Sequence, residues 1–571
     1  MKKIFCSVIV AVALLAGGCA TDEIVERRYL ASERHRTEIF AYDEQQQTML
    51  VCADTVRGVE VQAVVNRTKK HDDQLYVEVR LGKERRYVRA ESLVTDRGEV
   101  VAEKQIFVRT PASIITDTET SAIGGLADKG AMVEVIGYDS IDSRTGAVNR
   151  YRVRLGSVEG HLYGKYTVFK REEAMKRYMA ERYDPIHSAV KNPFGGGEAI
   201  GCDFYPTEKV SFPDNKMPRS CYSLYLNISP AVIGNIERYI AFAKRTKINT
   251  FVIDIKDNEC PGYKADAMEK YSPTNHRYAG KNKEEMYKKA VMRLHEEGFY
   301  VVGRITCFKD SHFVKDHPEV AITEIATGKP FKHNKAYWPS PYDRKVWHFN
   351  VELAKEAVRK FGFNEINFDY VRFPDRLTRI EKENIVDFHN KYKESKVQAI
   401  QRFVQYACDE IHAVGAYVSI DVFGEAANPG YTTAYGQYWP AISNVCDAIC
   451  GMPYPDHFSN NYYGVKQPWN HPYEILKAWG ERVQARQAVT PTPAAVRTWI
   501  QAYPVMRHVD KNGLRYDAED VEKEIRGLYA AGLTGGYTTW HSGSNLEKYK
   551  AQKAAFCIDY LKEWKKSNNK K

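Results

Sequence analysis

Three short segments of this chain end in an aspartate, at Asp254, Asp369 and Asp421. Each alternates apolar and polar residues with the two-residue period of a β-strand, so the aspartate lies on a polar face. In the second segment Asn367 shares the face of Asp369. Two carboxylates around one pocket, one ionised and one protonated, are the groups that hydrolyse a glycosidic bond. These segments are therefore the candidate catalytic positions.

Asp369 and Asp421 are the predicted catalytic pair. Asp369 lies near Arg372 in sequence, and a nearby cation keeps a carboxylate ionised, so Asp369 is the predicted nucleophile or base. Arg372 has the opposite strand parity, however, and can instead face a loop. Asp421 is the predicted acid, with Glu425 in the following loop as the alternative. Carboxyl groups ~5 Å apart would predict retention of anomeric configuration, ~6.5–9.5 Å inversion, and more than ~12 Å binding only.

Charged residues recur on the polar faces of four predicted strands. Lys256 shares a face with Asp254, and Arg304 lies on the polar face of another strand. Burying such ions costs several kcal/mol each unless they are paired, so their recurrence indicates a site. The alternative is a salt-bridge network that only stabilises the fold. Loop aromatics could equally shape a rim or fill the core. The predicted substrate-binding residues are Asp254, Lys256, Arg304, Tyr370, Arg372, Tyr454, His457 and Trp540.

Strand and helix alternate from residue 221 to residue 562, which predicts an α/β fold with a parallel sheet. Eight strands in this length are typical of a (β/α)8 TIM barrel, in which the carboxyl ends of the strands carry the chemistry. The strands are expected near 222–228, 250–256, 299–306, 365–371, 416–422, 446–452, 483–489 and 535–540. Helices that stop at a glycine are expected over 283–297, 344–361 and 520–531, with a further long helix ending near His412.

The residues before the barrel predict an all-β region. Residues 103–170 place a Gly-rich turn before the strand Met132–Gly137 and close on Gly160–Tyr166. This order resembles bacterial SH3-like domains, and 46–98 resembles a degenerate copy. The resemblance implies binding of cell-wall glycan or peptide; a rigid spacer is the alternative. The remaining segments are predicted to be a tether (20–45), a linker that begins with a charged helix (171–220) and a basic tail (563–571).

The first 19 residues predict a lipoprotein signal peptide. Lys2 and Lys3 precede an apolar run from Ile4 to Leu15, which is too short to span a membrane. Small residues then lead to Cys19, as in a bacterial lipobox. Lipidation of Cys19 would anchor the protein to a membrane of the cell envelope, facing the periplasm or the exterior. Ordinary signal cleavage nearby is the alternative.

Composition narrows the remaining classes. A chain of 571 residues predicts several domains. Its net charge of +10 comes with no basic stripe carrying interleaved aromatics, so nucleic-acid binding is not expected. The 11 cysteines do not form a disulfide framework; one bridge, Cys202 to Cys221, is possible, and Cys446 and Cys450 are expected to be buried thiols. No metal site and no cofactor are predicted.

Seven segments resemble, in order, a family of bacterial glycoside hydrolases that was formerly a domain of unknown function. They are Phe251–Asp257, Gly298–Asp310, Phe363–Pro374, Val418–Gly424, Met452–Pro455, Arg497–Gln501 and Thr539–Trp540. The resemblance implies a (β/α)8 fold with an Asp at positions 254, 369 and 421, which favours Asp421 over Glu425. The chain departs from the family pattern at two positions. It has Pro440 where the family often has Glu, and Asp456 where the family often has Ser, so the resemblance leaves the substrate open.

The first functional hypothesis is an exported, lipid-anchored glycoside hydrolase that acts on a cell-wall, capsular or other polysaccharide. Its partners would be that polysaccharide, a membrane through Cys19, and peptidoglycan through the SH3-like domains. The alternative is a non-catalytic glycan-binding lipoprotein of the cell envelope. Cleavage of peptidoglycan amide bonds is a third hypothesis, which the lack of a zinc or Cys/His pattern disfavours.

Overall fold

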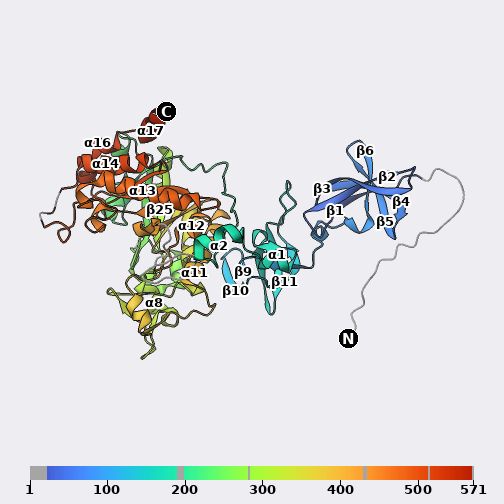
Figure 1. The fold of residues 1–571 in the computed structure, drawn as a ribbon, viewed down its shortest axis with the longest axis horizontal. Coiled ribbons are helices and arrows are strands. Elements are labelled where there is room, and N and C mark those ends of the chain that lie inside the picture. Colours follow the sequence, from blue (N-terminus) through green and yellow to red (C-terminus); the bar gives the residue numbers. More distant parts are fainter. Residues whose placement is uncertain are drawn as a thin grey trace. The chain divides into compact units, whose positions relative to one another are not determined.

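The computed structural model describes residues 22–188, 199–280, 283–428, 434–511, 513 and 515–568 (Figure 1). The chain forms two compact units. The first contains the described part of Met1–Phe107 together with Met132–Arg171. The second contains Val108–Ala131 and the described residues from Glu172 onward. Among the described residues, no helix combines the length and the apolar character that crossing a membrane requires.

The first unit is built from β-strands, which confirms the all-β prediction and fits SH3-like domains. Its first sheet has the strand order β3-β2-β6-β5-β4-β1-β7 around a small core that includes Leu30, Val79 and Val88. The strands of this sheet are β1 (Val25–Leu30), β2 (Arg36–Asp43), β3 (Thr48–Val56), β4 (Glu60–His71), β5 (Gln74–Leu81), β6 (Glu84–Arg89) and β7 (Leu93–Val94). The unit also holds β8 (Gln105–Val108), β11 (Met132–Tyr138), β12 (Arg150–Leu155), β13 (Val158–Tyr163) and β14 (Thr167–Val168).

Two predicted connecting segments are more ordered than expected. The tether prediction for 20–45 is wrong from Val25 on, because β1 pairs with β4 and β2 pairs with β3. Alternating residues such as Ile39 and Phe40 there are buried in the first unit. The described part of the predicted basic tail, residues 563–568, lies in the helix α17 (Tyr560–Asn568). The predicted charged helix of the linker is present as two short helices, α1 (Arg171–Met175) and α2 (Ala180–Ser188).

A β-hairpin from the N-terminal half belongs to the second unit. Its strands are β9 (Ala112–Asp117) and β10 (Ala122–Ala127), and its tip packs against α9 and α11. Three side chains on these helices hydrogen-bond to carbonyl oxygens of the tip: Lys355 to Glu119, His348 to Thr120 and Tyr406 to Ser121, each at 2.7 Å. The hairpin is thus fixed to the helical layer of the second unit.

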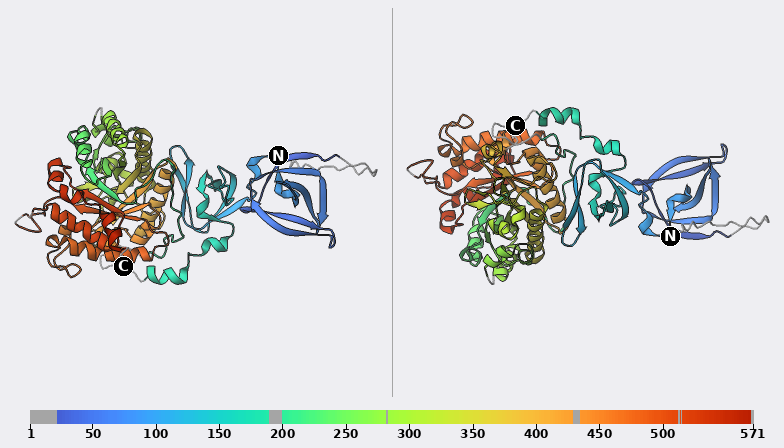
Figure 2. Two further views of the ribbon diagram at one scale, coloured as in Figure 1. Left: turned by 90° about the horizontal axis from the view of Figure 1, so that it is seen from above. Right: turned by 90° about the horizontal axis from the view of Figure 1, so that it is seen from below.

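The rest of the second unit is a closed barrel of parallel strands inside a ring of helices (Figure 2). Each strand pairs with the next, and β27 pairs with β15 to close the barrel. The strands are β15 (Cys221–Leu226), β16 (Thr250–Asp257), β18 (Tyr300–Thr306), β22 (Glu365–Asp369), β24 (Tyr417–Phe423), β25 (Ala448–Met452), β26 (Ala495–Gln501) and β27 (Gly536–Trp540). The (β/α)8 prediction is confirmed.

One predicted strand is wrong. Residues 483–489 lie in the helix α13 (Pro472–Ala488) and at its end, and the seventh barrel strand is β26. Val483 continues the buried helical stripe of Ile475 and Trp479, at intervals of four residues. The short apolar segment at the end of this helix therefore resembled a strand, whereas the true strand follows the proline-containing turn after it.

The helices predicted from their end signals are present, together with other main helices around the barrel. They are α4 (Ile236–Ala243), α7 (Lys283–Glu296), α9 (Arg344–Phe361), α11 (Lys396–His412), α12 (Trp439–Ser443), α13 and α14 (Ala518–Ala530). The side chain of Asp343 caps α9, which ends at Gly362 in the left-handed region with φ 77°. Ser395 and Gln398 form a capping box on α11.

The barrel has an apolar layer outside its strands and a second, mixed layer inside. The outer layer packs the strands against the helices, while the inner one includes Tyr225, Tyr300, Tyr417 and Trp499. The predicted Cys202–Cys221 bridge is wrong, because both are free thiols in separate buried clusters. Cys446 and Cys450 are buried free thiols, as predicted.

The close packing of α13 on β25 generates a stability prediction. A Cβ at Gly451 would lie 2.4 Å from the Trp479 ring, whose indole N–H donates to the Gly424 carbonyl at 2.8 Å. Because this hydrogen bond holds the ring in place, we expect Gly451→Ala to lower the free energy of unfolding by about 1–3 kcal/mol. Gly137→Ala is the control, since its Cβ would meet Arg152 at an ordinary 3.5 Å. Equal losses in urea denaturation of both variants would contradict the prediction.

Candidate active site

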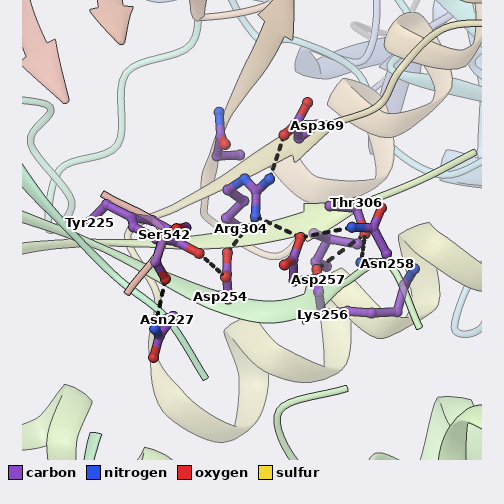
Figure 3. A network of polar contacts seen from close by, with 12 residues as sticks. Tyr225, Asn227, Asp254, Lys256, Asp257, Asn258, Arg304, Thr306, Asp369 and Ser542 are labelled. Atoms are coloured by element: carbon purple, nitrogen blue, oxygen red, sulfur yellow. Dashed lines mark hydrogen bonds and ion pairs between the residues drawn. The ribbon is translucent and has the colours of Figure 1, made fainter. Parts of the chain in front are cut away.

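The centre of the site is the guanidinium of Arg304, buried inside the barrel on β18. Nη1 contacts Oδ1 of Asp254 at 2.6 Å and Oδ1 of Asp257 at 3.4 Å. Nη2 contacts Oδ2 of Asp369 at 2.5 Å. Figure 3 shows the three carboxylates arranged around this one cation. The aspartates predicted from strand periodicity are therefore brought together, and Arg304 is the group that joins them.

Strand register explains this convergence. Asp254 is in register with Arg304 on the neighbouring strand, and Arg304 is in register with Asn367 on the next. Asn367 is in turn in register with Ser419, two residues before Asp421. Because alternate residues of each strand point into the barrel, these polar side chains form layers near the carboxyl ends of the strands.

Asp421 occupies a different environment from Asp369. Its Oδ1 accepts hydrogen bonds from Nδ2 of Asn367 and Nε1 of Trp499, both at 2.8 Å. Its Oδ2 has no hydrogen-bond partner among the described residues, and Nε of Arg304 lies 3.9 Å from it. Burial, together with the charge of Asp369, raises the pKa of Asp421 well above its usual range. This carboxyl therefore holds its proton more strongly than an ordinary aspartate.

Asp369 and Asp421 are close enough to act as a pair. Both contact the same guanidinium, at 2.5 Å and 3.9 Å. Those contacts hold the facing carboxylate oxygens no more than about 9 Å apart, which does not exceed the upper limit of roughly 9.5 Å that glycosidases use. This separation is below the ~12 Å beyond which binding without catalysis would have been expected. Of the two, Asp369 is the more accessible, with 9% of its side chain exposed against 0% for Asp421.

Asp254 and Lys256 are both enclosed. Asp254 accepts from Tyr225 Oη on one oxygen and from Arg304 on the other, and burial raises its pKa to about 6. The Nζ of Lys256 lies 3.0 Å from Oδ2 of Asp310, and both side chains are buried. Lys256 is therefore paired inside the protein. Asp257 is the open carboxylate of this segment, with 36% of its side chain exposed.

Arg372 lies in the loop after β22, as its strand parity allowed. Its guanidinium donates to the Phe373 carbonyl at 3.1 Å and lies 3.4 Å from Asp375. The rings of Trp338, Tyr370, Phe423 and Tyr435 surround it at 4.5–5.9 Å. Burial lowers the pKa of Arg372. The direct ion pair of Asp369, which the sequence suggested for Arg372, is formed by Arg304 instead.

The other predicted residues lie at different depths. Trp540 is half-buried, with its ring 4.7 Å from Tyr225 and 5.5 Å from the Arg304 guanidinium. Tyr454 is buried against the ring of His457, whose side chain is 52% exposed. Glu425 is half-buried in the loop after β24, and burial together with the nearby Asp375 raises its pKa. Trp540 thus contacts the Arg304 cluster directly.

Sequence reasoning missed two residues of the site, Tyr225 and Trp499. Tyr225 donates to Asp254, and Trp499 donates to Asp421. Tyr225 is the penultimate residue of β15 and lies on the same inward face as Ser223, so strand periodicity could have found it. Trp499 was missed because its strand was predicted in the wrong place, although it falls inside a segment that resembles the family.

A network that only stabilised the barrel would be expected to satisfy its buried polar atoms. In the described part of the chain, Nε of Arg304 and Oδ2 of Asp421 both lack hydrogen-bond partners, and they face each other. Two buried polar atoms without partners at the carboxyl end of barrel strands are what a binding or catalytic site leaves open for a ligand. This pair favours a functional site over a purely structural one.

The fold and this cluster define a (β/α)8 barrel protein with acidic residues at the carboxyl ends of its strands. The chain belongs to the family described as "Putative glycosyl hydrolase domain", whose profile matches residues 223–546. Its barrel is therefore a glycoside hydrolase domain.

Several solved structures are similar to parts of the chain. A hypothetical protein from Ruminiclostridium thermocellum is 32% identical, with 35% of this chain and 97% of that chain covered and a TM-score of 0.30. The PgaB glycoside hydrolase domain from Bordetella bronchiseptica is 13% identical, covering 60% and 99%, with a TM-score of 0.42. A β-N-acetylhexosaminidase from Bacteroides fragilis is 15% identical, covering 60% and 66%, with a TM-score of 0.38. A comparison with curated proteins gave no match.

The raised pKa of Asp421 generates a prediction on stability. A carboxyl whose pKa is higher in the folded state contributes stability that is complete below its unfolded pKa of about 3.9 and is lost as the pH rises through the folded value. Asp421→Asn cannot ionise, so we expect its free energy of unfolding to rise relative to wild type as the pH increases above about 4. Glu383→Gln, at an exposed ion pair with Arg379, is the control, because surface ion pairs contribute at most about 1 kcal/mol to stability. A constant difference between Asp421→Asn and wild type across this range in denaturant titrations would rule the assignment out.

Proposed function

We propose that this protein is an exported, lipid-anchored glycoside hydrolase that cleaves its polysaccharide with Asp369 and Asp421. The observation that carries the proposal is the contrast between two neighbouring carboxyl groups. Asp369 forms an ion pair with Arg304, which stabilises its charged form, whereas Asp421 is buried and its pKa is raised. A charged and a protonated carboxyl around one pocket are the two states that glycoside hydrolysis requires.

In this proposal Asp421 acts as the general acid. Its proton passes to the glycosidic oxygen as the bond from that oxygen to the anomeric carbon breaks. Asp369 either bonds to the anomeric carbon, giving a covalent intermediate that water then hydrolyses, or removes a proton from the attacking water. The limit of about 9 Å between the carboxylates is compatible with both routes. Trp540, half-buried beside Arg304, is the proposed platform for a sugar ring.

The proposed location rests on the N-terminal sequence. The lipobox-like segment that ends at Cys19 lies outside the described residues. Lipidation of Cys19 would hold the protein on a membrane of the cell envelope, and the SH3-like domains would bind peptidoglycan there. Cell-wall or capsular polysaccharide is then the proposed substrate, because it is the glycan within reach of such an anchor.

One observation favours a second candidate function, a glycan-binding lipoprotein without catalysis. The side chains of Asp254 and Asp421 are both fully buried, so neither carboxyl is exposed to a substrate in this conformation. In that case Trp540, Asp257 and Asp369, which are more open, would form the glycan-binding surface. Catalysis requires that Asp421 become accessible when the substrate binds.

The two functions are separated by reducing-end release from a panel of bacterial wall, capsular and amino-sugar polysaccharides. We expect release by the wild type, and a loss of roughly 10²-fold or more in kcat for Asp369→Asn and Asp421→Asn, because each removes one of the two reacting groups. Glu425→Gln tests the alternative acid and should retain most of the activity. Circular dichroism of each variant controls for folding. Retained glycan binding with no release by the wild type would establish the binding function instead, and loss only in Glu425→Gln would reassign the acid.

The anchor is tested separately by fractionating cells that express the full chain. We expect the wild type in the membrane fraction, with incorporation of a labelled fatty acid, and Cys19→Ser without label in the soluble exported fraction. Cys6→Ser, in the same N-terminal segment, is the matched control and should remain labelled. Unlabelled wild-type protein would refute lipidation.

A further inference from the structure

Asp421 receives both of its hydrogen bonds on the same oxygen. Nε1 of Trp499 and Nδ2 of Asn367 each lie 2.8 Å from Oδ1. Oδ2 has no such donor anywhere in the described ranges. The two oxygens of this carboxyl are therefore not equivalent, although nothing in the side chain itself distinguishes them.

A protonated carboxyl has one hydroxyl oxygen and one carbonyl oxygen, and the carbonyl oxygen is the better acceptor. Two N–H donors on Oδ1 make it the carbonyl oxygen and leave the proton to Oδ2. We propose that Trp499 and Asn367 are positioning residues that fix the acidic proton of Asp421 on Oδ2. The meaning of this arrangement for catalysis rests on the proposed function, whereas the arrangement itself does not.

The groups that face Asp421 give Oδ2 a defined direction. Arg304 on β18 lies 3.9 Å from Oδ2 and also binds Asp369 on β22. Cys307 after β18, Cys450 on β25 and Tyr454 after β25 are further titratable neighbours, and burial raises the pKa of all three, so they remain uncharged. The proton is thus held on the side of the carboxyl that faces Arg304, the cation that also holds the second catalytic carboxylate.

Both donors are themselves held in place. The ring of Trp499 packs edge-on against Trp540 at 5.6 Å and against Tyr225 at 5.9 Å. Nδ2 of Asn367 also contacts Oγ of Ser419 at 3.1 Å. Since these side chains are buried, neither donor can turn away from Oδ1 without disturbing the packing inside the barrel.

The test is infrared difference spectroscopy of Trp499→Phe over a pH titration, with the Asp421→Asn spectrum used to identify the carboxyl band. Losing one donor to Oδ1 should move the C=O stretch of protonated Asp421 to higher frequency. It should also raise the apparent pKa of the band by about one pH unit, because the charged form loses a hydrogen bond. Trp439→Phe is the matched control: it removes another buried indole N–H, which donates to Gln487 at 3.0 Å, and should leave the band unchanged. An unchanged band in Trp499→Phe, or an equal shift in both variants, would overturn the proposal.

Asn367→Leu provides a second route should Trp499→Phe not fold, since it removes the other donor at similar volume, and it should shift the band in the same direction. On a cleaved substrate, Trp499→Phe should lower kcat about tenfold with little change in KM, because the proton is no longer fixed. The basic limb of its pH–kcat profile should move to higher pH. If the Asp421 band shifts but neither the wild type nor any variant hydrolyses a glycan, the positioning role is retained and the proposed hydrolase function is refuted. If the wild type hydrolyses a glycan but the band does not shift, the hydrolase function is retained and the positioning role is refuted.

Discussion

A single buried cation organises the interior of this barrel. Arg304 contacts Asp254, Asp257 and Asp369, and it also lies close to Asp421. The buried charges of Asp254 and Asp369 would be costly inside the protein without a partner, and one guanidinium with five N–H groups can serve several carboxylates at once. The positions of the Asp254 and Asp369 side chains therefore depend on this residue. A lysine could not replace it, because its ammonium is a compact charge without the planar fork.

Arg304 lies at different distances from the carboxyl groups around it. The Arg304 guanidinium makes short contacts with Asp369 and Asp254, whereas Asp421 lies 3.9 Å from it. Asp421 is neutralised by its proton instead. One fold thus holds similar side chains in different protonation states within a few ångströms. The difference comes from burial and from which nitrogen each oxygen contacts, and the proposed hydrolytic roles of Asp369 and Asp421 depend on it.

The surrounding layers keep this interior fixed. The helices pack against the outer face of every strand, as the contact between Trp479 and Gly451 illustrates, and capped termini hold α9 and α11 in place. The β9–β10 hairpin adds a further brace against these two helices through the contacts made by Lys355, His348 and Tyr406. Part of the chain before the barrel is thereby joined to the unit that carries the site.

The sequence by itself determined the class of fold and most of the acidic cluster. A two-residue period with an aspartate at the end of the strand was enough to place Asp254, Asp369 and Asp421 on inward faces, because alternation is a local property of a strand. The tertiary structure alone decided which cation binds Asp369, since Arg372 is near in sequence but turns into an aromatic loop, whereas Arg304 comes from a neighbouring strand. It also decided the roles of Tyr225 and Trp499, whose partners lie 29 and 78 residues away. Periodicity fixes where one side chain points; the register between strands fixes what it meets, and that register is set only when the barrel closes.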